Sequence, residues 1–569
     1  MKASDALAKF LIAHRVQTCF ELVGGMITHL LDSFAESRQF NIVSMHHEQS
    51  AAFAAEGVAR HTKGKTIAVA MGTSGPGATN LITGIGSCWF DSVPCLFITG
   101  QVNTRELKGG RGIRQQGFQE LDIVEVVRSL TKYAVRVDRP EDLLPELHKA
   151  LSASLSGRQG PVLLDIPNDV QRADIPDALV EKWLNTSLEI NTGPEIGLND
   201  LKKLAALCKD AQRPLICIGG GARWADAMDA WLSTADALGI PCVSTLMGHE
   251  RVIARNNYFN MIGSYGNREA NWAVQNCDLL IVVGARLDVR QTGADVDDFA
   301  RKARIVQIDI DPSQLDNRVK ADLNICATAE SFFKVFPFRA ATFPNLDKNW
   351  LTELSKQRDR AQFNEYADWE ISPSEIFKKL NHSLANQPVD YVCDVGNHQM
   401  WAAQNLRLSP NQAVHYSGGM GAMGFALPAA LGIALQSRNK AVVITGDGSL
   451  QINIQELDTL NRMGLDLTII VMNNLVLGMV KNFQDMYFDG RDQSTRKGYS
   501  SPSFTDIATA YGIEAHRVTN VTEMDRALKL IAECKGPLLI EIMMDGATEC
   551  RPRLAFGSKL DEQFPQLNA

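Results

Sequence analysis

The chain has 569 residues, which is too many for one hydrophobic core, and about three domains are expected at roughly 100–200 residues each. Lys and Arg number 57 against 65 Asp and Glu, so the net charge of −8 excludes a broad positive surface for nucleic acid or anionic membranes. The eleven cysteines form no CxxC pair and no His/Cys cluster at zinc spacing. This pattern favours reduced thiols in a cytoplasmic protein without structural zinc.

Three blocks of the sequence alternate short β-branched runs with helical stretches. This alternation predicts an α/β fold of three doubly wound, parallel-sheet domains at residues 1–175, 190–340 and 370–548, with a C-terminal tail at 549–569. Two polar, Pro-bearing connections, Asp174–Asp200 and Ala341–Ser372, are interpreted as interdomain linkers, and the second is charge-rich and expected to be partly helical. The expected strands include Thr66–Ala70, Cys95–Thr99, Val162–Ile166, Leu215–Ile218, Leu279–Val283, Ile305–Ile310, Ala441–Thr445, Leu467–Met472 and Leu538–Ile542.

Two uncharged stretches, Thr66–Phe90 and Leu408–Ser437, have the length of a membrane span. Both are crowded with Gly and contain Pro, Asn, and Ser or Thr. Buried parallel strands joined by glycine-rich turns explain this composition better than membrane spans do. We therefore expect no membrane association.

The strongest chemical signal lies in the third block. Gly446-Asp447-Gly448-Ser449 follows one expected strand, and Asn473-Asn474 follows the next, with a helical stretch at about 451–462 between them. A right-handed βαβ crossover brings both strand ends to the same edge of the sheet. A carboxylate and an amide oxygen there suit Mg²⁺, and the N–H groups at Gly448 and Ser449 favour phosphate. The pattern predicts a metal-bridged diphosphate, although a turn glycine and helix cap would explain GDG alone.

This pattern resembles the fingerprint of the thiamine-diphosphate (ThDP) enzymes. The resemblance implies that Asp447, Asn474 and the backbone carbonyl of Val476 bind the metal. It also implies that Glu48, in MHHEQSAAFAAEG, meets the aminopyrimidine of ThDP and helps its amino nitrogen to remove the C2 proton, after which the cofactor acts as the nucleophile. A helix cap is the alternative interpretation of Glu48. In this family the two motifs meet across a dimer interface.

The resemblance is closest to acetolactate synthase-like enzymes and covers almost the whole chain. It is carried by GTSGPGATN (72–80), DSVPCLFITGQV (91–102), VGNHQMWAAQ (395–404), SGGMGAMGFALPAA (417–430) and GMV (478–480), among other stretches. It implies that the diphosphate edge includes Gly396 and His398, that Met423 bends ThDP, and that Phe118 and Gln119 reach the reacting carbons from the partner chain. It also implies an apolar pocket at C2 lined by Gly24, Gly25, Met479 and Val480.

Acetolactate synthases bind FAD in the middle domain, and the resemblance implies FAD here. Gly219-Gly220-Gly221 follows a strand without matching GxGxxG, whereas GARLD after LLIVV is a better signal. A middle domain that binds ADP or nothing is the alternative. The implied flavin contacts are Arg158, Gly219, Gly220, Thr245, Leu246, Met261, Gly284, Ala285, Arg286, Asp288 and Asp309, with Gly263 in a similar stretch.

Several positions depart from the family pattern. Cys326-Ala327 replaces a Gly-Asp pair, Asn168 replaces a lysine, and Phe483 replaces the tryptophan that selects 2-ketobutyrate as acceptor in biosynthetic enzymes. The ending RPRLAFGSKLDEQFPQLNA also differs. The Cys326-Ala327 pair leaves one adenosine-side contact without its expected residue. The absent tryptophan leaves pyruvate and bulkier ketones as candidate acceptors, and the ending is similar to that of flavin-containing carboligases whose acceptors include a keto-sugar nucleotide.

The expected function is a ThDP- and Mg²⁺-dependent carboligase that adds a two-carbon unit from pyruvate to a second keto compound. A simple 2-keto acid decarboxylase fits less well, because Gly112-Ile113-Arg114-Gln115-Gln116 lacks the histidine pair used by pyruvate decarboxylases. A non-catalytic flavin- or nucleotide-binding homologue is disfavoured by the presence of Glu48 and Asp447. The family implies a homodimer or homotetramer with active sites between subunits.

Overall fold

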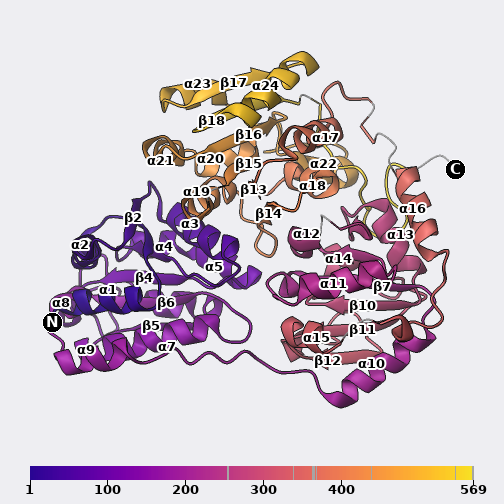
Figure 1. The fold of residues 1–569 in the computed structure, drawn as a ribbon. Helices are drawn as coiled ribbons and strands as arrows, with labels where there is room; N and C mark the ends of the chain where they lie inside the picture. The colour runs from indigo at the N-terminus through magenta and orange to yellow at the C-terminus, as the bar shows by residue number, and fades with distance from the viewer. Residues whose placement is uncertain are drawn as a thin grey trace.

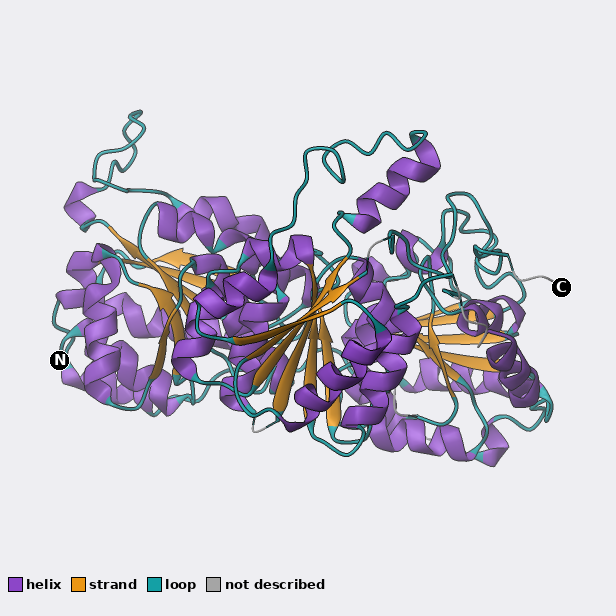
Figure 2. Cartoon of the chain, turned by 90° about the horizontal axis from the view of Figure 1, so that it is seen from above, coloured by secondary structure: helices purple, strands orange, loops and turns teal. Residues whose placement is uncertain are grey.

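The structure is a computed structural model that describes residues 1–252, 255–336, 339–361, 365–366, 368–437, 439–544 and 546–566. It contains three sheets, each of six parallel strands, with helices on both faces (Figures 1 and 2). The strand orders are β2-β1-β3-β4-β6-β5, β12-β11-β10-β7-β8-β9 and β14-β13-β15-β16-β18-β17. The prediction of three doubly wound α/β domains with parallel sheets is confirmed.

The first domain appears in indigo and purple in Figure 1. Its strands are β1 (Thr18–Leu22), β2 (Asn41–Ser44), β3 (Val69–Gly72), β4 (Leu96–Gln101), β5 (Tyr133–Arg136) and β6 (Val162–Pro167). Its α-helices are α1 (Ala3–Ala13), α2 (Thr28–Ser37), α3 (Glu48–His61), α4 (Pro76–Asn80), α5 (Ile82–Asp91), α6 (Ile123–Val127), α7 (Leu143–Leu155), α8 (Asn168–Arg172) and α9 (Asp177–Leu184).

The middle domain follows a connection that runs along the lower edge of Figure 1. Its strands are β7 (Pro214–Ile218), β8 (Cys242–Ser244), β9 (Tyr258–Met261), β10 (Leu279–Val283), β11 (Arg304–Asp309) and β12 (Leu323–Cys326). Its α-helices are α10 (Leu198–Asp210), α11 (Met228–Ala237), α12 (Leu246–Val252), α13 (Arg268–Asn276), α14 (Val289–Thr292), α15 (Ala329–Val335) and α16 (Trp350–Ala361).

The third domain, in orange and yellow, lies above the other two in Figure 1. Its strands are β13 (Val389–Cys393), β14 (Gln412–Tyr416), β15 (Lys440–Gly446), β16 (Leu467–Asn473), β17 (Glu514–Val518) and β18 (Leu538–Met543). Its α-helices are α17 (Pro373–Leu384), α18 (Asn397–Asn405), α19 (Ala426–Gln436), α20 (Asp447–Ile452), α21 (Glu456–Met463), α22 (Gly478–Tyr487), α23 (Phe504–Ala510) and α24 (Val521–Glu533).

The central strands are buried on both faces, as their continuous apolar runs predict. Every residue of β15 and of β16 is buried, and the two strands pair in parallel from Ala441↔Leu467 to Gly446↔Met472. The expected strand Thr66–Ala70 instead begins at Val69, where Cys19 of β1 first offers a pairing partner. The local sequence thus predicts that a strand is present. The residue at which the strand begins depends on where the neighbouring strand can pair with it.

Two local expectations differ from the structure in detail. The single helix expected at about 451–462 is divided into α20 and α21, because Asn453 leaves the helical conformation and its Nδ2 donates to the Gly424 carbonyl at 2.8 Å. The stretch Ala341–Ser372 is not simply a linker. Its helix α16 buries Trp350 completely, and the Trp350 Nε1 donates to the Pro214 carbonyl at 3.0 Å. Helix α16 therefore packs on the middle domain.

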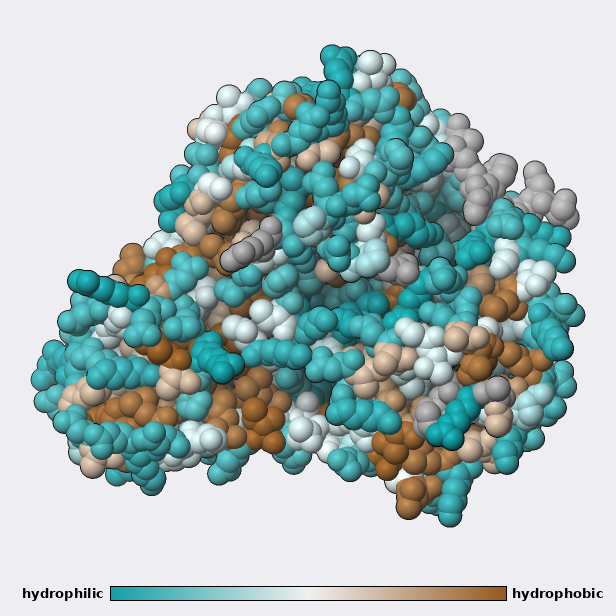
Figure 3. Space-filling model, in the orientation of Figure 1, coloured by the Kyte–Doolittle hydropathy of each residue, from teal (hydrophilic) through white to brown (hydrophobic). Residues whose placement is uncertain are grey.

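The third domain shares a hydrophobic core with each of the others. Helices α3 and α19 approach closely at glycines: a Cβ on Gly57 would lie 2.2 Å from the Ala429 carbonyl oxygen, and one on Gly432 would lie 2.0 Å from the Ala54 carbonyl oxygen. Hydrophilic residues cover most of the face in Figure 3, with apolar areas along the lower edge of the first and middle domains. Among the described residues, no helix is both long enough and apolar enough to cross a membrane.

Candidate active site

The carboxyl edge of the third sheet brings together the two ends of the predicted metal site. Because β15 and β16 are parallel neighbours, Asp447 and Asn474 follow directly from adjacent strands at this edge. Asp447 is 2% exposed and begins α20, and its Oδ2 accepts a hydrogen bond from the Tyr499 hydroxyl at 2.9 Å. Burial raises the pKa of Asp447 to about 6. A bound cation would oppose this effect by stabilising the carboxylate.

The two adjacent asparagines have different surroundings. Asn473 Nδ2 donates to Glu541 at 2.8 Å and its Oδ1 accepts from the Leu475 N–H, so this side chain is used within the fold. Asn474 Nδ2 donates to the Ala547 carbonyl at 2.7 Å, while its Oδ1 has only a long contact of 3.4 Å with the Val476 N–H. Val476 itself is buried. The hydrogen bond to Ala547 therefore holds the Asn474 amide nitrogen in place, and the amide oxygen can serve as a metal ligand.

His398 lies between two glycines of the predicted diphosphate edge. A Cβ on Gly396 would lie 2.6 Å from the imidazole Cε1, and one on Gly446 would lie 2.8 Å from Nδ1. Burial lowers the pKa of His398 to about 3, so the ring is neutral at physiological pH. Among the described residues, its Nε2 and the adjacent Asn397 Nδ2 have no hydrogen-bond partner. Unpaired buried polar atoms at this edge fit a phosphate-bearing ligand.

The loop that carries Met423 is held by a carboxylate that the sequence reasoning missed. Asp394 follows β13, is buried, and accepts backbone hydrogen bonds from Val395 at 2.8 Å, Gly424 at 2.9 Å and Ala426 at 2.9 Å. Burial raises the pKa of Asp394 to about 6. A Cβ on Gly448 would lie 3.3 Å from the Met423 Cε, so the loop reaches the GDG motif. The signal available for Asp394 was an acidic residue directly after the short apolar run Tyr391-Val392-Cys393. Ser449, also predicted at this edge, donates through Oγ to the Val395 carbonyl at 2.7 Å.

Glu48 is the first residue of α3 and is 4% exposed. Its Oε2 accepts a hydrogen bond from Asn80 Nδ2 at 2.9 Å, and a Cβ on Gly77 would lie 3.1 Å from Oε1. His47 caps the helix by accepting from the Gln49 N–H, so Glu48 is not needed as the cap. The contacts of Glu48 and of Asp447 share no residue among the described part of the chain. Their meeting at one cofactor stays a prediction.

The residues predicted at the reacting carbons face solvent in the single chain. Phe118 is 80% exposed, Val480 54% and Phe483 50%. Phe483 and Val480 lie on α22, with Met479 half-buried beside them. In the first domain, Gln119 has a φ of 65° next to Gly75, Gly24 packs on Thr73, and the space beside Gly25 is open.

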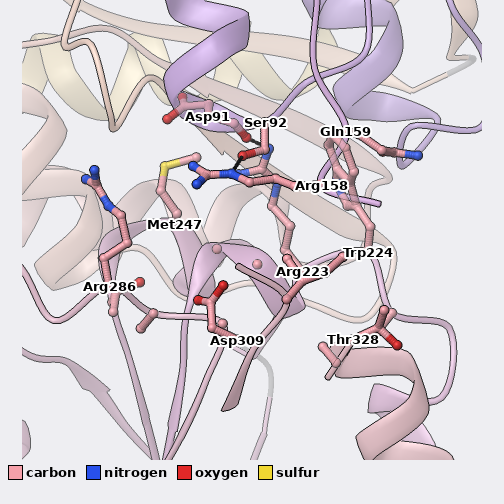
Figure 4. Close-up of a pocket in the computed structure, with 18 of the residues that line it drawn as sticks. Asp91, Ser92, Arg158, Gln159, Arg223, Trp224, Met247, Arg286, Asp309 and Thr328 are labelled. Carbon is pink, nitrogen blue, oxygen red and sulfur yellow. Dashed lines mark hydrogen bonds between the residues drawn. The ribbon is translucent and has the colours of Figure 1, made fainter. Parts of the chain in front are cut away.

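A cavity of about 720 Å³ lies where the three domains meet (Figure 4). In Figure 4, Arg158 and Arg286 extend over it, with Asp309 beneath them. Gly219 lies outside the lining: a Cβ there would be 2.2 Å from the Gly284 carbonyl oxygen, so glycine allows the ends of β7 and β10 to approach closely. The predicted flavin residues in the lining are Arg158, Gly220, Thr245, Leu246, Met261, Gly284, Ala285, Arg286, Asp288 and Asp309.

Other cavity residues were not found from the sequence. Ser92 Oγ accepts a hydrogen bond from Arg158 Nε at 2.9 Å, and Arg223 stacks on Trp224 with its guanidinium 4.4 Å from the ring centroid. Met247 lies against Gly418. Of the departing pair at 326–327, Ala327 lines the cavity while Cys326 does not. These positions carry no local pattern that distinguishes them from ordinary loop and core residues.

Buried charges join the three domains beside this cavity. The Asp91 carboxylate accepts hydrogen bonds from Arg60, from the Gly418 N–H at 3.1 Å and from the Gly419 N–H at 2.7 Å. Arg223 of the middle domain donates to the Asp91 carbonyl at 2.6 Å. The loop that contains Gly418 and Gly419 therefore lines the cavity. A few residues further along, this loop carries Met423.

The comparisons with known proteins identify the class. Residues 1–126, 201–335 and 394–542 match, in turn, the N-terminal TPP binding domain, the central domain and the C-terminal TPP binding domain of thiamine pyrophosphate enzymes. The chain belongs to the thiamine pyrophosphate enzymes.

Within that class, the similarity is to acetolactate synthases. The chain is 34% identical over 574 residues to the acetolactate synthase isozyme 2 large subunit of Escherichia coli (strain K12), covering 100% of both chains. It is 34% identical over 568 residues to the acetolactate synthase large subunit of Cyanidium caldarium, covering 97% of this chain and 94% of that protein. A probable acetolactate synthase large subunit of Methanocaldococcus jannaschii is 33% identical over 579 residues, with 98% and 94% covered. The chain belongs to the acetolactate synthase-like branch, as the sequence predicted.

Proposed function

We propose that this protein is a ThDP-dependent carboligase that takes pyruvate as donor, releases CO₂ and adds the remaining two-carbon unit to a second keto compound. The observation that carries the proposal is the buried edge formed by Asp447, Asn474 and His398, where His398 Nε2 and the adjacent Asn397 Nδ2 have no hydrogen-bond partner among the described residues. The full-length similarity to proteins named acetolactate synthase supports the reaction class.

The residues at this edge suit ThDP and Mg²⁺. Asp447, the Asn474 side-chain oxygen and the Val476 carbonyl would hold the metal, and His398 with the N–H groups at Gly448 and Ser449 would meet the diphosphate. When bound, ThDP supplies the carbon nucleophile that the side chains of this chain lack. Met423, anchored through Asp394, would fix the cofactor's conformation. Glu48 would hold a proton at the aminopyrimidine, where its burial excludes water from the carboxylate.

In this proposal, side chains on helix α22 select the acceptor ketone. Phe483 contacts Tyr487 at 4.7 Å and Phe488 at 5.8 Å between ring centroids, so an aromatic surface follows the Met479-Val480 pair. We propose pyruvate or a bulkier ketone, such as a keto-sugar nucleotide, as acceptor, because the tryptophan associated with 2-ketobutyrate selection is absent.

We propose FAD as the occupant of the three-domain cavity. Its volume of about 720 Å³ is within the range of ligand pockets, and Arg158, Arg223 and Arg286 bring positive charge to it. Asp309, whose pKa burial raises, lies at the end of β11, where an adenosine hydroxyl could donate to it. The carboligation needs no net redox change, so the flavin would act by filling and bracing the junction of the domains.

We also propose a homodimer or homotetramer that works in the cytoplasm. The exposed apolar side chains of Phe118, Val480 and Phe483 belong to the predicted reaction site, and a partner subunit would cover them. All eleven cysteines are unpaired, which suits a reducing compartment.

Product analysis with carbon-labelled pyruvate tests the function. The enzyme with ThDP, Mg²⁺ and FAD should convert pyruvate alone to acetolactate, or, when a ketone acceptor is added, to a cross-coupled product with a tertiary alcohol. Labelled acetaldehyde as the main product under every condition would instead establish a simple decarboxylase. Absence of CO₂ release with all three cofactors present would refute the proposal.

A further inference from the structure

Three potential metal ligands meet between the first and third domains, away from the GDG edge. They are His61, the last residue of α3, Asp390 on β13, and His415 on β14. One ligand atom from each lies within 4.8 Å of the other two. None of the three lines the three-domain cavity or belongs to the predicted ThDP contacts.

The fold explains how two of these side chains come together. His415 pairs with Val392 across the parallel strands, and Asp390 lies two residues before Val392 on β13. Because side chains two apart on a strand share a face, Asp390 and His415 point to the same side of the sheet. Helix α3 ends beside these two side chains, and its C-terminal residue His61 completes the group. The negative end of the helix dipole at His61 also favours a cation.

The distances fit ion pairs between Asp390 and the two histidines, and they also fit three ligands around a shared tetrahedral metal. Asp390 Oδ1 lies 3.4 Å from His61 Nδ1 and 3.6 Å from His415 Nε2. Both separations exceed the range of about 2.7–3.2 Å for ordinary N–H···O bonds. Ligands at about 2.0–2.2 Å from a tetrahedral Zn²⁺ stand about 3.4 Å apart. The Asp390 oxygen therefore stands near both nitrogens at the separation expected along the edges of a tetrahedron.

The surroundings also resemble a ligand site. His415 is 6% exposed, and its Nε2 has no hydrogen-bond partner among the described residues. The other Asp390 oxygen, Oδ2, accepts from Ser437 Oγ at 2.9 Å and Asn439 Nδ2 at 3.0 Å, which orients Oδ1 toward the histidines. The His61 side chain is 24% exposed, so it provides an entry path and room for water as a fourth ligand.

We propose that His61, Asp390 and His415 bind a divalent transition-metal ion of the Zn²⁺ class. Two imidazole nitrogens and one carboxylate oxygen select such an ion over Mg²⁺, which prefers oxygen ligands. The ion ties the end of α3 to the edge strand β14 and its neighbour β13, and so clamps the first domain to the third. This site is separate from the Mg²⁺ site of the proposed reaction. An experiment can therefore refute the Zn²⁺ proposal without refuting the proposed function, and the reverse also holds.

Calorimetric titration with Zn²⁺ tests the site on untagged, full-length protein saturated with ThDP and Mg²⁺. Wild type should bind one Zn²⁺ per chain and unfold at a higher temperature with it. His61→Ala and His415→Gln should each weaken Zn²⁺ binding by more than about 100-fold, since even second-shell changes cost 10–100-fold. The matched control is His516→Ala, an exposed histidine of the same domain as His415, which should bind like wild type.

Two results would overturn the proposal. One is equal Zn²⁺ binding by wild type and by His61→Ala, a partly exposed position where the substitution should leave the fold intact. The other is binding that survives both histidine variants and is lost in Asp447→Ala, because the ion would then occupy the diphosphate edge. If His415→Gln does not fold, His61→Ala alone decides the outcome.

Discussion

Glu48 is the residue whose replacement tests the proposed chemistry most directly. The Glu48→Gln change keeps the size of the side chain, and the amide oxygen can still accept the hydrogen bond that Asn80 Nδ2 gives at 2.9 Å. Exchanging a charged for a neutral acceptor costs about 1 kcal/mol of folding free energy, and the smaller desolvation cost at a position only 4% exposed offsets part of it. The variant should therefore fold.

Its activity should nevertheless fall steeply. An amide cannot share a proton as a carboxylate does, and positioned acid–base groups contribute about 10²–10⁴-fold to a rate. This corresponds to about 3–5 kcal/mol of activation free energy. We expect kcat for CO₂ release from labelled pyruvate to drop by that factor, while ThDP affinity, followed by quenching of tryptophan fluorescence, stays within a few-fold of wild type.

Two further variants sharpen the interpretation. Asn80→Ala removes the donor that orients the Glu48 carboxylate and should give an activity between wild type and Glu48→Gln. Glu141→Gln changes an exposed glutamate of the same domain and should behave as wild type. A Glu48→Gln enzyme that retains near-normal kcat would refute the assignment of Glu48 as the proton-holding group.

Four other substitutions have defined outcomes. Asp447→Ala should weaken Mg²⁺-dependent ThDP binding by about 100-fold or more in a metal titration, because a buried ligand is lost; unchanged affinity would contradict the metal assignment. Gly432→Ala would place a Cβ 2.0 Å from the Ala54 carbonyl oxygen, and overpacking of about 1–3 kcal/mol against a helix-propensity gain of about 1 kcal/mol should lower the denaturation midpoint; a raised midpoint would show that the helices can separate freely. Arg286→Ala should weaken FAD binding by about 10–100-fold, measured by flavin fluorescence, since a charge-assisted hydrogen bond contributes about 1.5–3 kcal/mol. An FAD affinity equal to that of wild type would show that Arg286 does not contact the flavin. Phe483→Trp should raise the preference for 2-ketobutyrate over pyruvate about 5-fold or more in competition assays. An unchanged product ratio would show that α22 does not select the acceptor.

Much of the fold could be predicted from local sequence. Runs such as LTIIVM can bury their apolar side chains only inside a sheet that is covered on both faces. The three-domain architecture with parallel sheets follows from such runs. The helix break at Asn453 could not be predicted in this way, because it depends on the Gly424 carbonyl, which is distant in sequence. Trp350 similarly required knowledge of the middle sheet on which it packs.

By itself, the sequence determined which chemistry the strand ends carry. Asp447 and Asn474 stand directly after adjacent strands, and parallel pairing leaves them at a single edge whatever the rest of the chain does. Tertiary structure alone decided that Asp394 holds the Met423 loop, that the cavity draws residues from all three domains, and that His61 meets Asp390 and His415. The spacing of the cysteines and histidines had excluded only local zinc motifs. The physical reason is that strand and turn chemistry acts between near neighbours in the chain, whereas these contacts join residues far apart in sequence and form only when a domain folds or when domains bury their surfaces against each other.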